Sequence, residues 1–313
     1  MNEAGKERIR IAIVGAGAMG CLLAVMFHKA GLEVVLIEKQ QDRTKWINER
    51  GLLVEGVPGE SRMKIRAVDD PTEAGQCDLL IFAVKAYDTA NACQGVGLLL
   101  TENSSVLTLQ NGVGNVEILC AEFGPEKVLG GTTSFGATAL GPGHIRYAGA
   151  GETVVAERVN RGGRLYDVIG LINTAGLNAS AADDLDGLIW GKVLINVGIN
   201  AITAVAGVRN GVLVRDENGR ALMRMAVEEA ERIVKALGVT LPYEYPVAKA
   251  EAVARGTAEN VSSMLQDVAA HRRTEIEFIN GAIVHEGRRL GIPTPVNEVL
   301  SLLVEIKSDV ILP

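Results

Sequence analysis

The chain has 313 residues, of which 48% are hydrophobic and 22% are charged. This composition is typical of a folded globular protein, and the length suggests two domains whose cores need no disulfide or structural metal. The net charge of −7 argues against a nucleic acid as the main partner, since no cluster of Lys and Arg offsets it.

The first predicted elements form a strand–helix–strand unit. The β-branched run Arg10–Val14 is typical of a buried parallel strand, and an apolar helix follows it as far as Phe27. Gly31 ends this helix, and Val34–Ile37 forms the second strand. One complete βαβ unit is therefore expected at the start of the chain.

Strand and helix patterns alternate through the rest of the first half. Further strands are expected at Leu79–Val84 and Val106–Leu109, with helices that begin near Asp88 and Val113. Between residues 128 and 157 short β-type segments are separated by glycines, and a helix at Arg164–Ala175 closes this half.

The second half changes character, because helical periodicity replaces β-type alternation after about Ala182. Strands alternating with helices, followed by helices alone, predict an α/β protein with two domains. Residues 1–183 are expected to form an N-terminal Rossmann-type domain, and residues 184–313 a C-terminal all-α domain. The expected helices of the second domain are Asp184–Ala206, Asp216–Leu237, Pro246–Arg255, Ser262–Leu290 and Pro295–Lys307.

The turn after the first strand has the pattern G-x-G-x-x-G. The first glycine permits a tight turn, the second lets the backbone approach a pyrophosphate, and the third lets helix and strand pack closely. The helix that follows adds N–H groups and a positive dipole end. Glycine turns also occur without a ligand, but within a complete βαβ unit the pattern predicts a dinucleotide site. The expected cofactor-binding residues are Gly15, Ala16, Gly17, Ala18, Met19 and Gly20.

Glu38 and Lys39 follow the second strand, at the position where such domains distinguish NAD from NADP. A carboxylate there can hold the ribose 2′-hydroxyl, whereas a cation can hold a 2′-phosphate. Glu38 therefore favours NAD(H), while Lys39, with Arg43 behind it, favours NADP(H). The two neighbouring charges could also simply neutralise each other in solvent. These residues alone leave the choice open.

A polar stripe crosses the apolar helix expected at Asp184–Ala206. Lys192, Asn196 and Asn200 recur at every fourth residue, so they span an arc of about 80° and share one face. Polar groups on so apolar a helix need partners if they are buried. A cleft that binds a polar acid would use all three residues. The alternative is a lysine that extends to solvent, beside amides that bond neighbouring backbone.

No metal site and no membrane span are expected. The four cysteines form no C-x-x-C pair and the four histidines are scattered, a pattern typical of reduced thiols in a cytoplasmic protein. Three glycines interrupt the apolar stretch Ile11–Phe27, which favours a strand-turn-helix over a signal peptide. The stretch Val193–Val208 contains two asparagines and falls short of a membrane span.

Several further stretches resemble one family, the ketopantoate reductases (2-dehydropantoate 2-reductases), in both order and spacing. The resemblance runs from Arg10 to about Leu303. It implies an NADPH-dependent oxidoreductase that reduces ketopantoate to (R)-pantoate in pantothenate biosynthesis, with the substrate bound between the two domains. The stretches are Ala83–Ala86 (AVKA), Gln110–Gly114 (QNGVG), Trp190–Lys192 (WGK), Ser262–Asp267 (SSMLQD) and Glu275–Gly281 (EIEFING).

Carried over by position, the resemblance implies that Lys192 and Glu275 are the catalytic pair, with Glu275 also on the cofactor side. Asn111 is expected beside both the nicotinamide and the substrate. Lys39 falls where family members often place a basic residue against the 2′-phosphate, which favours NADP(H), although Glu38 keeps NAD(H) possible. The remaining positions are a cofactor-side lysine, Lys85, and the substrate-binding residues Asn196, Asn200, Asn210 and Ser263.

The roles implied for Ser263 and Glu275 depend on how the chain folds around them. Ser263 and Glu275 are twelve residues apart and cannot share a face of one straight helix, so both can contact the substrate only if the helix breaks between them or they approach from different sides. Glu275 could also be a surface carboxylate paired with Arg272.

Other functions stay open at this point. A related reductase of another 2-oxo acid, or a 3-hydroxy acid dehydrogenase, would use a similar Lys/Asn set. A non-catalytic dinucleotide sensor would not need Lys192, Asn196, Asn200 and Glu275 together, and their presence counts against it. The expected partner is a small 2-oxo acid, with neither nucleic acid nor membrane, and the protein is expected to be a monomer or homodimer.

Overall fold

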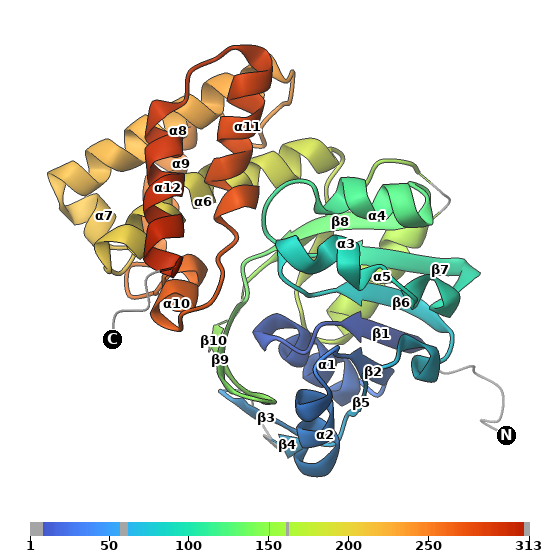
Figure 1. Ribbon diagram of the computed structural model, residues 1–313. Coiled ribbons are helices and arrows are strands. Elements are labelled where there is room, and N and C mark those ends of the chain that lie inside the picture. The colour runs from blue at the N-terminus through green and yellow to red at the C-terminus, as the bar shows by residue number, and fades with distance from the viewer. Residues whose placement is uncertain (1–8, 57–61, 150, 161–162, 310–313) are drawn as a thin grey trace, which may run out of the picture. The chain divides into compact units, whose positions relative to one another are not determined.

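The computed structural model describes residues 9–56, 62–149, 151–160 and 163–309 (Figure 1). The chain divides into two compact units. The first contains residues up to 110 and residues 115–185, and the second contains residues 111–114 and everything from 186 onward. Each unit has its own hydrophobic core. The expected boundary after residue 183 did not foresee that residues 111–114 join the second unit.

An eight-stranded sheet forms the centre of the first unit (Figure 1). Neighbouring strands are parallel except at one pair, β8 and β11. The inner strands are rich in buried Val, Ile and Leu, as expected where a parallel sheet is covered on both faces. Across the sheet the strands are β12 (Ala179–Ala181), β11 (Thr153–Glu157), β8 (Val128–Thr133), β7 (Leu100–Thr108), β6 (Cys77–Phe82), β1 (Arg10–Val14), β2 (Glu33–Ile37) and β5 (Arg66–Val68).

A second, four-stranded sheet lies in the same unit. Helix α1 contacts strands of both sheets, which explains why it is apolar nearly all round. The strands of this sheet, in order, are β4 (Arg62–Met63), β3 (Leu52–Glu55), β10 (His144–Gly149) and β9 (Gly136–Gly141). The helices of the unit are α1 (Ala18–Lys29), α2 (Gln41–Arg50), α3 (Thr89–Ala92), α4 (Asn115–Phe123) and α5 (Arg164–Thr174), with 3₁₀ turns at Pro71–Ala74, Ala86–Asp88 and Val96–Leu99.

The second unit is helical throughout its described residues. Helix α6 supplies much of its core, while α8 packs against α7, α9, α11 and α12. Its helices are α6 (Leu185–Ala206), α7 (Val212–Arg215), α8 (Glu217–Ala236), α9 (Pro246–Gly256), α10 (Ser263–Ala269), α11 (Asn280–Leu290) and α12 (Pro295–Asp309), with a 3₁₀ turn at Ile276–Phe278.

Within the described residues, α6 is the one helix long and apolar enough to cross a membrane. However, 61% of its apolar window is buried inside the protein, as in the core helix of a globular domain. Its apolar residues pack in the core of the second unit.

The prediction of one long helix at Ser262–Leu290 was wrong, because three separate elements occupy this range: α10, the 3₁₀ turn and α11. Helix α10 ends at Ala269, and His271 takes a left-handed backbone conformation with φ 50°. The amide of Arg272 then bonds back to the carbonyl of Asp267 at 2.9 Å. The break between Ser263 and Glu275, which the sequence required for a shared site, is therefore present.

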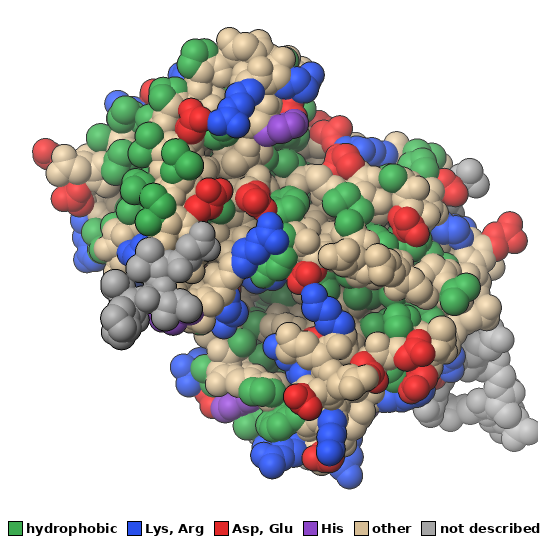
Figure 2. Space-filling view, in the orientation of Figure 1, with side chains coloured by type: hydrophobic (Ala, Val, Ile, Leu, Met, Phe, Trp, Pro, Cys, Tyr) green, Lys and Arg blue, Asp and Glu red, His purple; other side chains and the backbone are tan. Residues whose placement is uncertain are grey.

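Hydrophobic side chains gather on one face of the second unit, over α12 (Figure 2). Four exposed residues follow helical spacing along α12, and two more lie on the adjoining α8. They are Val299, Leu302, Leu303 and Ile306 on α12, and Leu222 and Met225 on α8.

Candidate active site

The glycine-rich turn joins β1 to α1 in the first unit. Gly15 has a φ of 103°, which side-chain-bearing residues rarely adopt, and its amide donates to the carbonyl of Ile37 at 2.8 Å. A Cβ on Gly20 would clash with the carbonyl oxygen of Gly15, so the third glycine is required for packing. A Cβ on Gly17 would meet no heavy atom within 4 Å. The space above the second glycine is therefore open.

The N-terminus of α1 is suited to an anion. Its N-cap residue is Gly17, no side chain caps the free N–H groups, and the first turn contains no acidic residue. Ala18 and Met19 are only partly buried there. An uncapped helix N-terminus behind an open glycine turn fits the pyrophosphate of a dinucleotide.

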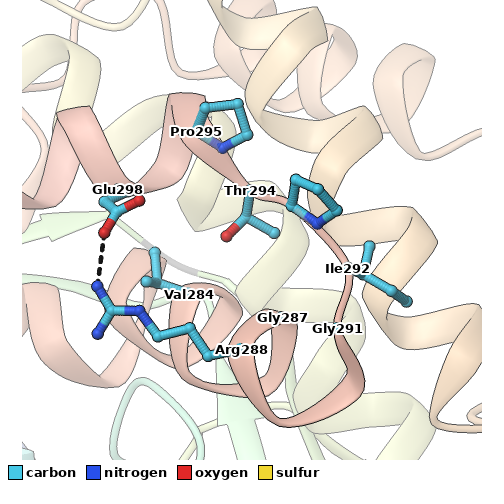
Figure 3. A pocket seen from close by; sticks show the side chains of 9 residues that line it. Val284, Gly287, Arg288, Gly291, Ile292, Thr294, Pro295 and Glu298 are labelled. Carbon is cyan, nitrogen blue, oxygen red and sulfur yellow. Dashed lines mark hydrogen bonds and ion pairs between the residues drawn. The ribbon is translucent and has the colours of Figure 1, made fainter.

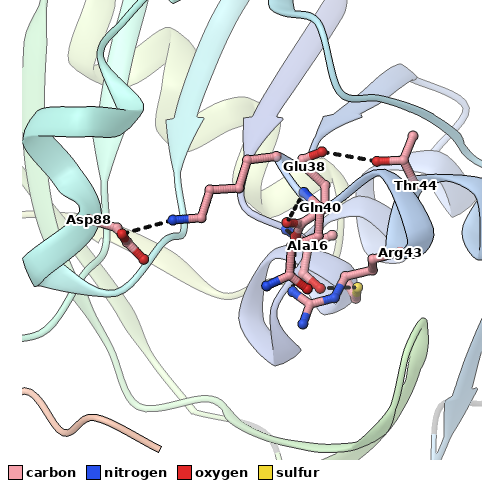
Figure 4. Close-up of polar contacts among 8 residues, drawn as sticks. Ala16, Glu38, Gln40, Arg43, Thr44 and Asp88 are labelled. Atoms are coloured by element: carbon pink, nitrogen blue, oxygen red, sulfur yellow. Dashed lines mark hydrogen bonds and ion pairs between the residues drawn. The ribbon is translucent and has the colours of Figure 1, made fainter.

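Glu38 lies at the carboxyl end of β2, and its side chain is held by three donors (Figure 4). The amide of Ala16 donates to Oε2 at 3.2 Å, the amide of Gln40 to Oε1 at 3.0 Å, and Arg43 Nη1 to Oε2 at 2.9 Å. Only 5% of Glu38 is exposed. A buried carboxylate is thus fixed directly beside the glycine-rich turn.

The two lysines expected on the cofactor side follow β2 and β6, the strands on either side of β1. Lys39 follows β2 and is exposed, and its Nζ pairs with Asp88 Oδ1 at 3.0 Å (Figure 4). Lys85 is half-buried and precedes the 3₁₀ turn that follows β6. Both therefore stand at the carboxyl edge of the sheet, where open α/β sheets bind ligands.

The polar stripe of α6 lies in the second unit. Lys192 and Asn196 are partly buried, and Asn200 is 6% exposed. Burial lowers the pKa of Lys192 to about 8, while the nearby Glu275 carboxylate opposes this decrease. A lysine with so low a pKa can hold and release a proton near neutral pH. This is not the behaviour of a lysine that extends to solvent.

Glu275 precedes the 3₁₀ turn Ile276–Phe278 and is 6% exposed. It is not a surface carboxylate paired with Arg272, since the Arg272 guanidinium bonds Asp267 Oδ1 at 3.1 Å instead. The Glu275 charge acts on Lys192, so these two predicted catalytic residues lie close together. Asn280, a little further along the chain, also contacts α6, where it binds Val197, 83 positions away in the sequence.

Asn111 begins the short segment that joins the second unit. The amide of Val113 donates to the carbonyl of Phe278 at 3.1 Å, three residues after Glu275. Gly112 has a φ of 87°, and a Cβ there would lie 2.6 Å from Phe278 Cβ. The Asn-Gly turn is therefore pressed against the segment that carries Glu275, and this close approach requires the glycine.

The other predicted substrate residues lie at separate places in the second unit. Ser263 is the first residue of α10 and is exposed. The preceding Ser262 shares a hydrogen bond of 2.7 Å with Thr203, one turn beyond Asn200 on α6. Asn210 is buried and donates its amide to Thr257 Oγ1 at 2.9 Å, a contact that ties the start of α7 to the end of α9. This contact of Asn210 connects two helices, and its role toward the substrate stays a prediction.

A shallow surface pocket is found elsewhere, between the end of α11 and the start of α12 (Figure 3). It is lined by Val284, Ile292 and Pro295, with the Arg288–Glu298 ion pair at its edge. None of the predicted site residues lines it. Among the described residues, no group of three or more His, Cys, Asp or Glu side chains could hold a metal ion.

Sequence reasoning missed three partners in these sites. Asp88 was expected only as a helix start, yet it binds Lys39. Arg43 was interpreted as a phosphate ligand, yet it binds Glu38. Ser262 was not singled out, although a serine before a short helix is a known N-cap signal, and its Oγ accepts from the Leu265 amide at 3.2 Å.

Comparison with known families agrees with this arrangement. The sequence model described as "Ketopantoate reductase PanE/ApbA" matches residues 11–160, and the model "Ketopantoate reductase PanE/ApbA C terminal" matches residues 184–308. The 2-dehydropantoate 2-reductase of Archaeoglobus fulgidus is 39% identical over 299 residues, which are 94% of this chain and 96% of the relative.

Two solved structures are similar over nearly the whole chain. A PanE/ApbA family ketopantoate reductase from Ralstonia eutropha JMP134 is 34% identical with a TM-score of 0.87, covering 96% of this chain and 99% of that one. D-mandelate dehydrogenase in complex with NADH and anilino(oxo)acetate is 28% identical with a TM-score of 0.89, with the same coverage. With its Rossmann-like N-terminal unit and helical C-terminal unit, the chain belongs to the ketopantoate reductases, a family of oxidoreductases that bind a nicotinamide dinucleotide.

Proposed function

We propose that this chain reduces ketopantoate (2-dehydropantoate) to (R)-pantoate, a step of pantothenate biosynthesis, in the cytoplasm. The observation that carries the proposal is the pairing of Lys192 with the buried Glu275 in a unit that also contains Asn111, Asn196 and Asn200. Family membership supports the substrate class, because the relatives named above are 2-dehydropantoate 2-reductases and ketopantoate reductases.

The first unit would hold the cofactor. The open space above Gly17 and the uncapped N-terminus of α1 fit a pyrophosphate, and the end of β2 fits the adenosine ribose. Lys85 would serve on the nicotinamide side, as the family resemblance implies. When bound, a reduced nicotinamide dinucleotide supplies the hydride for the ketone carbon. Whether that cofactor carries a 2′-phosphate depends on Glu38, Lys39 and Arg43.

Lys192 would act on the ketone oxygen. As the carbonyl is reduced, negative charge grows on this oxygen, and a lysine ammonium beside it stabilises the charge and then supplies the proton. A pKa of about 8 leaves most of the Lys192 side chains protonated at neutral pH, yet makes the proton easier to release than from an ordinary lysine.

The surrounding polar groups would select the acid. Glu275 orients the Lys192 ammonium or accepts a hydrogen bond from the primary hydroxyl of the substrate. Asn196 and Asn200, on the same face of α6, bind the hydroxyl end, and Ser263 binds the carboxylate. Buried amides on an apolar helix cost free energy unless they are paired, which favours a polar ligand over an apolar one.

One alternative has a specific observation behind it. The similarity to D-mandelate dehydrogenase, whose structure contains NADH and anilino(oxo)acetate, favours a related reductase of another 2-oxo acid as the second candidate. Such an enzyme would keep Lys192 and the cofactor site but would not need a hydroxyl on its substrate. A 3-hydroxy acid dehydrogenase and a non-catalytic sensor have no comparable observation in their favour.

The test is an assay of cofactor oxidation with the purified chain. Ketopantoate should be reduced with either NADH or NADPH as donor, and pantoate of one configuration should appear. Phenylglyoxylate, the 2-oxo acid related to mandelate, should be a poor substrate. Turnover of phenylglyoxylate with none of ketopantoate would instead support the second candidate. No turnover of any 2-oxo acid in a panel, despite cofactor binding, would support the sensor.

A further inference from the structure

The charged side chains around the end of β2 are arranged so that they disfavour a 2′-phosphate. Glu38 keeps its carboxylate buried, where it accepts from the Ala16 amide at 3.2 Å, the Gln40 amide at 3.0 Å and Arg43 at 2.9 Å (Figure 4). Its carbonyl also accepts from Thr44 Oγ1 at 3.0 Å, so the backbone is held as well. Arg43 supplies a charged donor and the Ala16 and Gln40 amides supply backbone donors, and together they fix the position of the carboxylate. A fixed anion therefore stands beside the glycine-rich turn.

The basic residues near this anion are already engaged. Arg43 pairs with Glu38, and Lys39 pairs with Asp88 at 3.0 Å. These two acids and two bases sum to zero charge, so the cluster has no surplus positive charge for another anion. A phosphate monoester carries about −1.5 to −2 at neutral pH, and next to Glu38 it would be repelled unless the ion pairs rearranged. A ribose hydroxyl, in contrast, donates a hydrogen bond to the carboxylate without any such change.

We infer that this protein selects NADH over NADPH, and that Glu38 is the residue that determines the choice. The inference rests on the proposed dinucleotide site in the first unit. Arg43 acts as a positioning residue that holds the Glu38 carboxylate, and Lys39 contributes little to cofactor selection because Asp88 holds it. The expectation of an NADPH preference assumed that Lys39 and Arg43 are both available for the phosphate. Their ion pairs instead favour NADH, the alternative that Glu38 kept open.

The experiment measures binding rather than turnover. Titration calorimetry on the full chain, with NADH and NADPH separately and no acid present, should give a Kd for NADH at least about tenfold lower than for NADPH. Glu38→Gln keeps the shape and one acceptor oxygen, so one of the Ala16 and Gln40 amides keeps its partner. This variant should bind NADH more weakly and NADPH more tightly, since Arg43 is released, and the ratio should approach one or invert.

Two controls make the outcome specific. Glu49→Gln removes the same charge from the exposed last turn of α2 and should leave the ratio unchanged. Adenosine 2′,5′-bisphosphate against 5′-AMP tests the 2′-phosphate on the unmutated chain, so the inference stays testable even if Glu38→Gln fails to fold. The 5′-AMP should bind more tightly.

Tighter binding of NADPH than NADH, or an unchanged ratio in folded Glu38→Gln, would overturn the inference. So would a selective loss of NADPH affinity in Lys39→Ala, because that result would identify Lys39 as the phosphate ligand. If neither cofactor binds, the dinucleotide site itself fails and with it the proposed function. The two failures are therefore distinguishable.

Discussion

At the scale of single residues, the proton on Lys192 sets a pH limit for the proposed reaction. Burial lowers the pKa of this lysine to about 8, so its ammonium form persists below that pH and is lost above it. Because reduction needs the protonated form, kcat/KM for ketopantoate should be flat below about pH 8 and fall roughly tenfold per pH unit above it. A pH profile at constant ionic strength measures this limit.

Substitutions at Lys192 complete the test. Lys192→Ala should lower kcat by about 10²–10⁴, the usual contribution of a positioned acid, while cofactor affinity is kept. Lys192→Arg keeps the charge but holds its proton across the whole range. Its activity should be low and the limit near pH 8 should disappear. A profile in the unmutated chain that stays flat up to pH 10 would assign the proton to another group.

Two glycines of the same turn should respond in opposite ways to alanine. Gly17 has an ordinary φ of −74° and open space around it, so Gly17→Ala should fold with an unchanged Tm. Its methyl group would occupy the space reserved for the pyrophosphate, and NADH affinity should fall by about tenfold or more. Gly20→Ala meets the carbonyl oxygen of Gly15 and should lower stability by at least about 1–3 kcal/mol.

Differential scanning calorimetry and cofactor titration of both variants separate these effects. An unchanged NADH affinity in folded Gly17→Ala would mean that no phosphate approaches the second glycine. The roles of these glycines could be predicted from the sequence because backbone conformation is local. The ion pairs of Glu38 with Arg43 and of Lys39 with Asp88 could not be predicted, since they depend on how these side chains turn in the folded unit.

At the scale of elements, α12 begins on a buried carboxylate supplied by α8. Glu229 accepts from the amides of Val296 and Asn297, both at 3.0 Å, and from Asn297 Nδ2 at 2.8 Å. A negative charge at a helix N-terminus is stabilising, and removing it leaves buried donors unpaired. Glu229→Ala should therefore lower the free energy of unfolding by about 3 kcal/mol.

Chemical denaturation of the full chain, followed by circular dichroism, measures this loss. Glu228→Ala is the matched control, because Glu228 is exposed on the same helix and its removal should change stability by less than about 0.5 kcal/mol. Equal losses in the two variants would show that helix propensity, and not the cap, accounts for the effect.

Elements with strong local signals were predicted well. The β-branched runs of β1 and β2 lie where the sequence placed them, and α8 begins after Asp216, whose carboxylate accepts from the Gly219 amide at 2.8 Å. The prediction for residues 262–290 failed because α10 ends at Ala269 and the left-handed residue that follows is His271, which lacks the signal that glycine gives at such ends. The polar residues 271–274 could continue a helix by propensity, but they have no apolar face to pack.

At the scale of the whole molecule, the sequence did not predict that residues 111–114 belong to the second unit. The segment is held by a contact with Phe278, which is distant in sequence, and helix α4 starts after it at Asn115, two residues beyond Val113. The residue patterns alone also did not indicate that Glu275 approaches Lys192, which only the family resemblance implied. The family resemblance named both residues as a catalytic pair, and the fold adds that the Glu275 charge acts on Lys192.

The choice of substrate depends on the polar groups that the second unit assembles. If Asn196, Asn200 and Glu275 surround a hydroxyl of the acid, an analogue without that hydroxyl leaves buried groups unpaired, which costs more than a missing methylene. Ketopantoate should therefore exceed 3-methyl-2-oxobutanoate in kcat/KM by at least about a hundredfold. Steady-state kinetics with both acids, at a saturating concentration of the preferred cofactor, measures this ratio.

Asn200→Ala should lower the ratio of kcat/KM between ketopantoate and 3-methyl-2-oxobutanoate. The decrease should come chiefly from slower reduction of ketopantoate, because 3-methyl-2-oxobutanoate has no hydroxyl for the Asn200 amide to bind. Asn218→Ala is the control, since Asn218 is exposed on α8 and the variant should keep the ratio of the unmutated chain. If the two acids already react equally without any substitution, the hydroxyl is not recognised. The fold and the role of Lys192 would stand, but the chain would serve a 2-oxo acid other than ketopantoate.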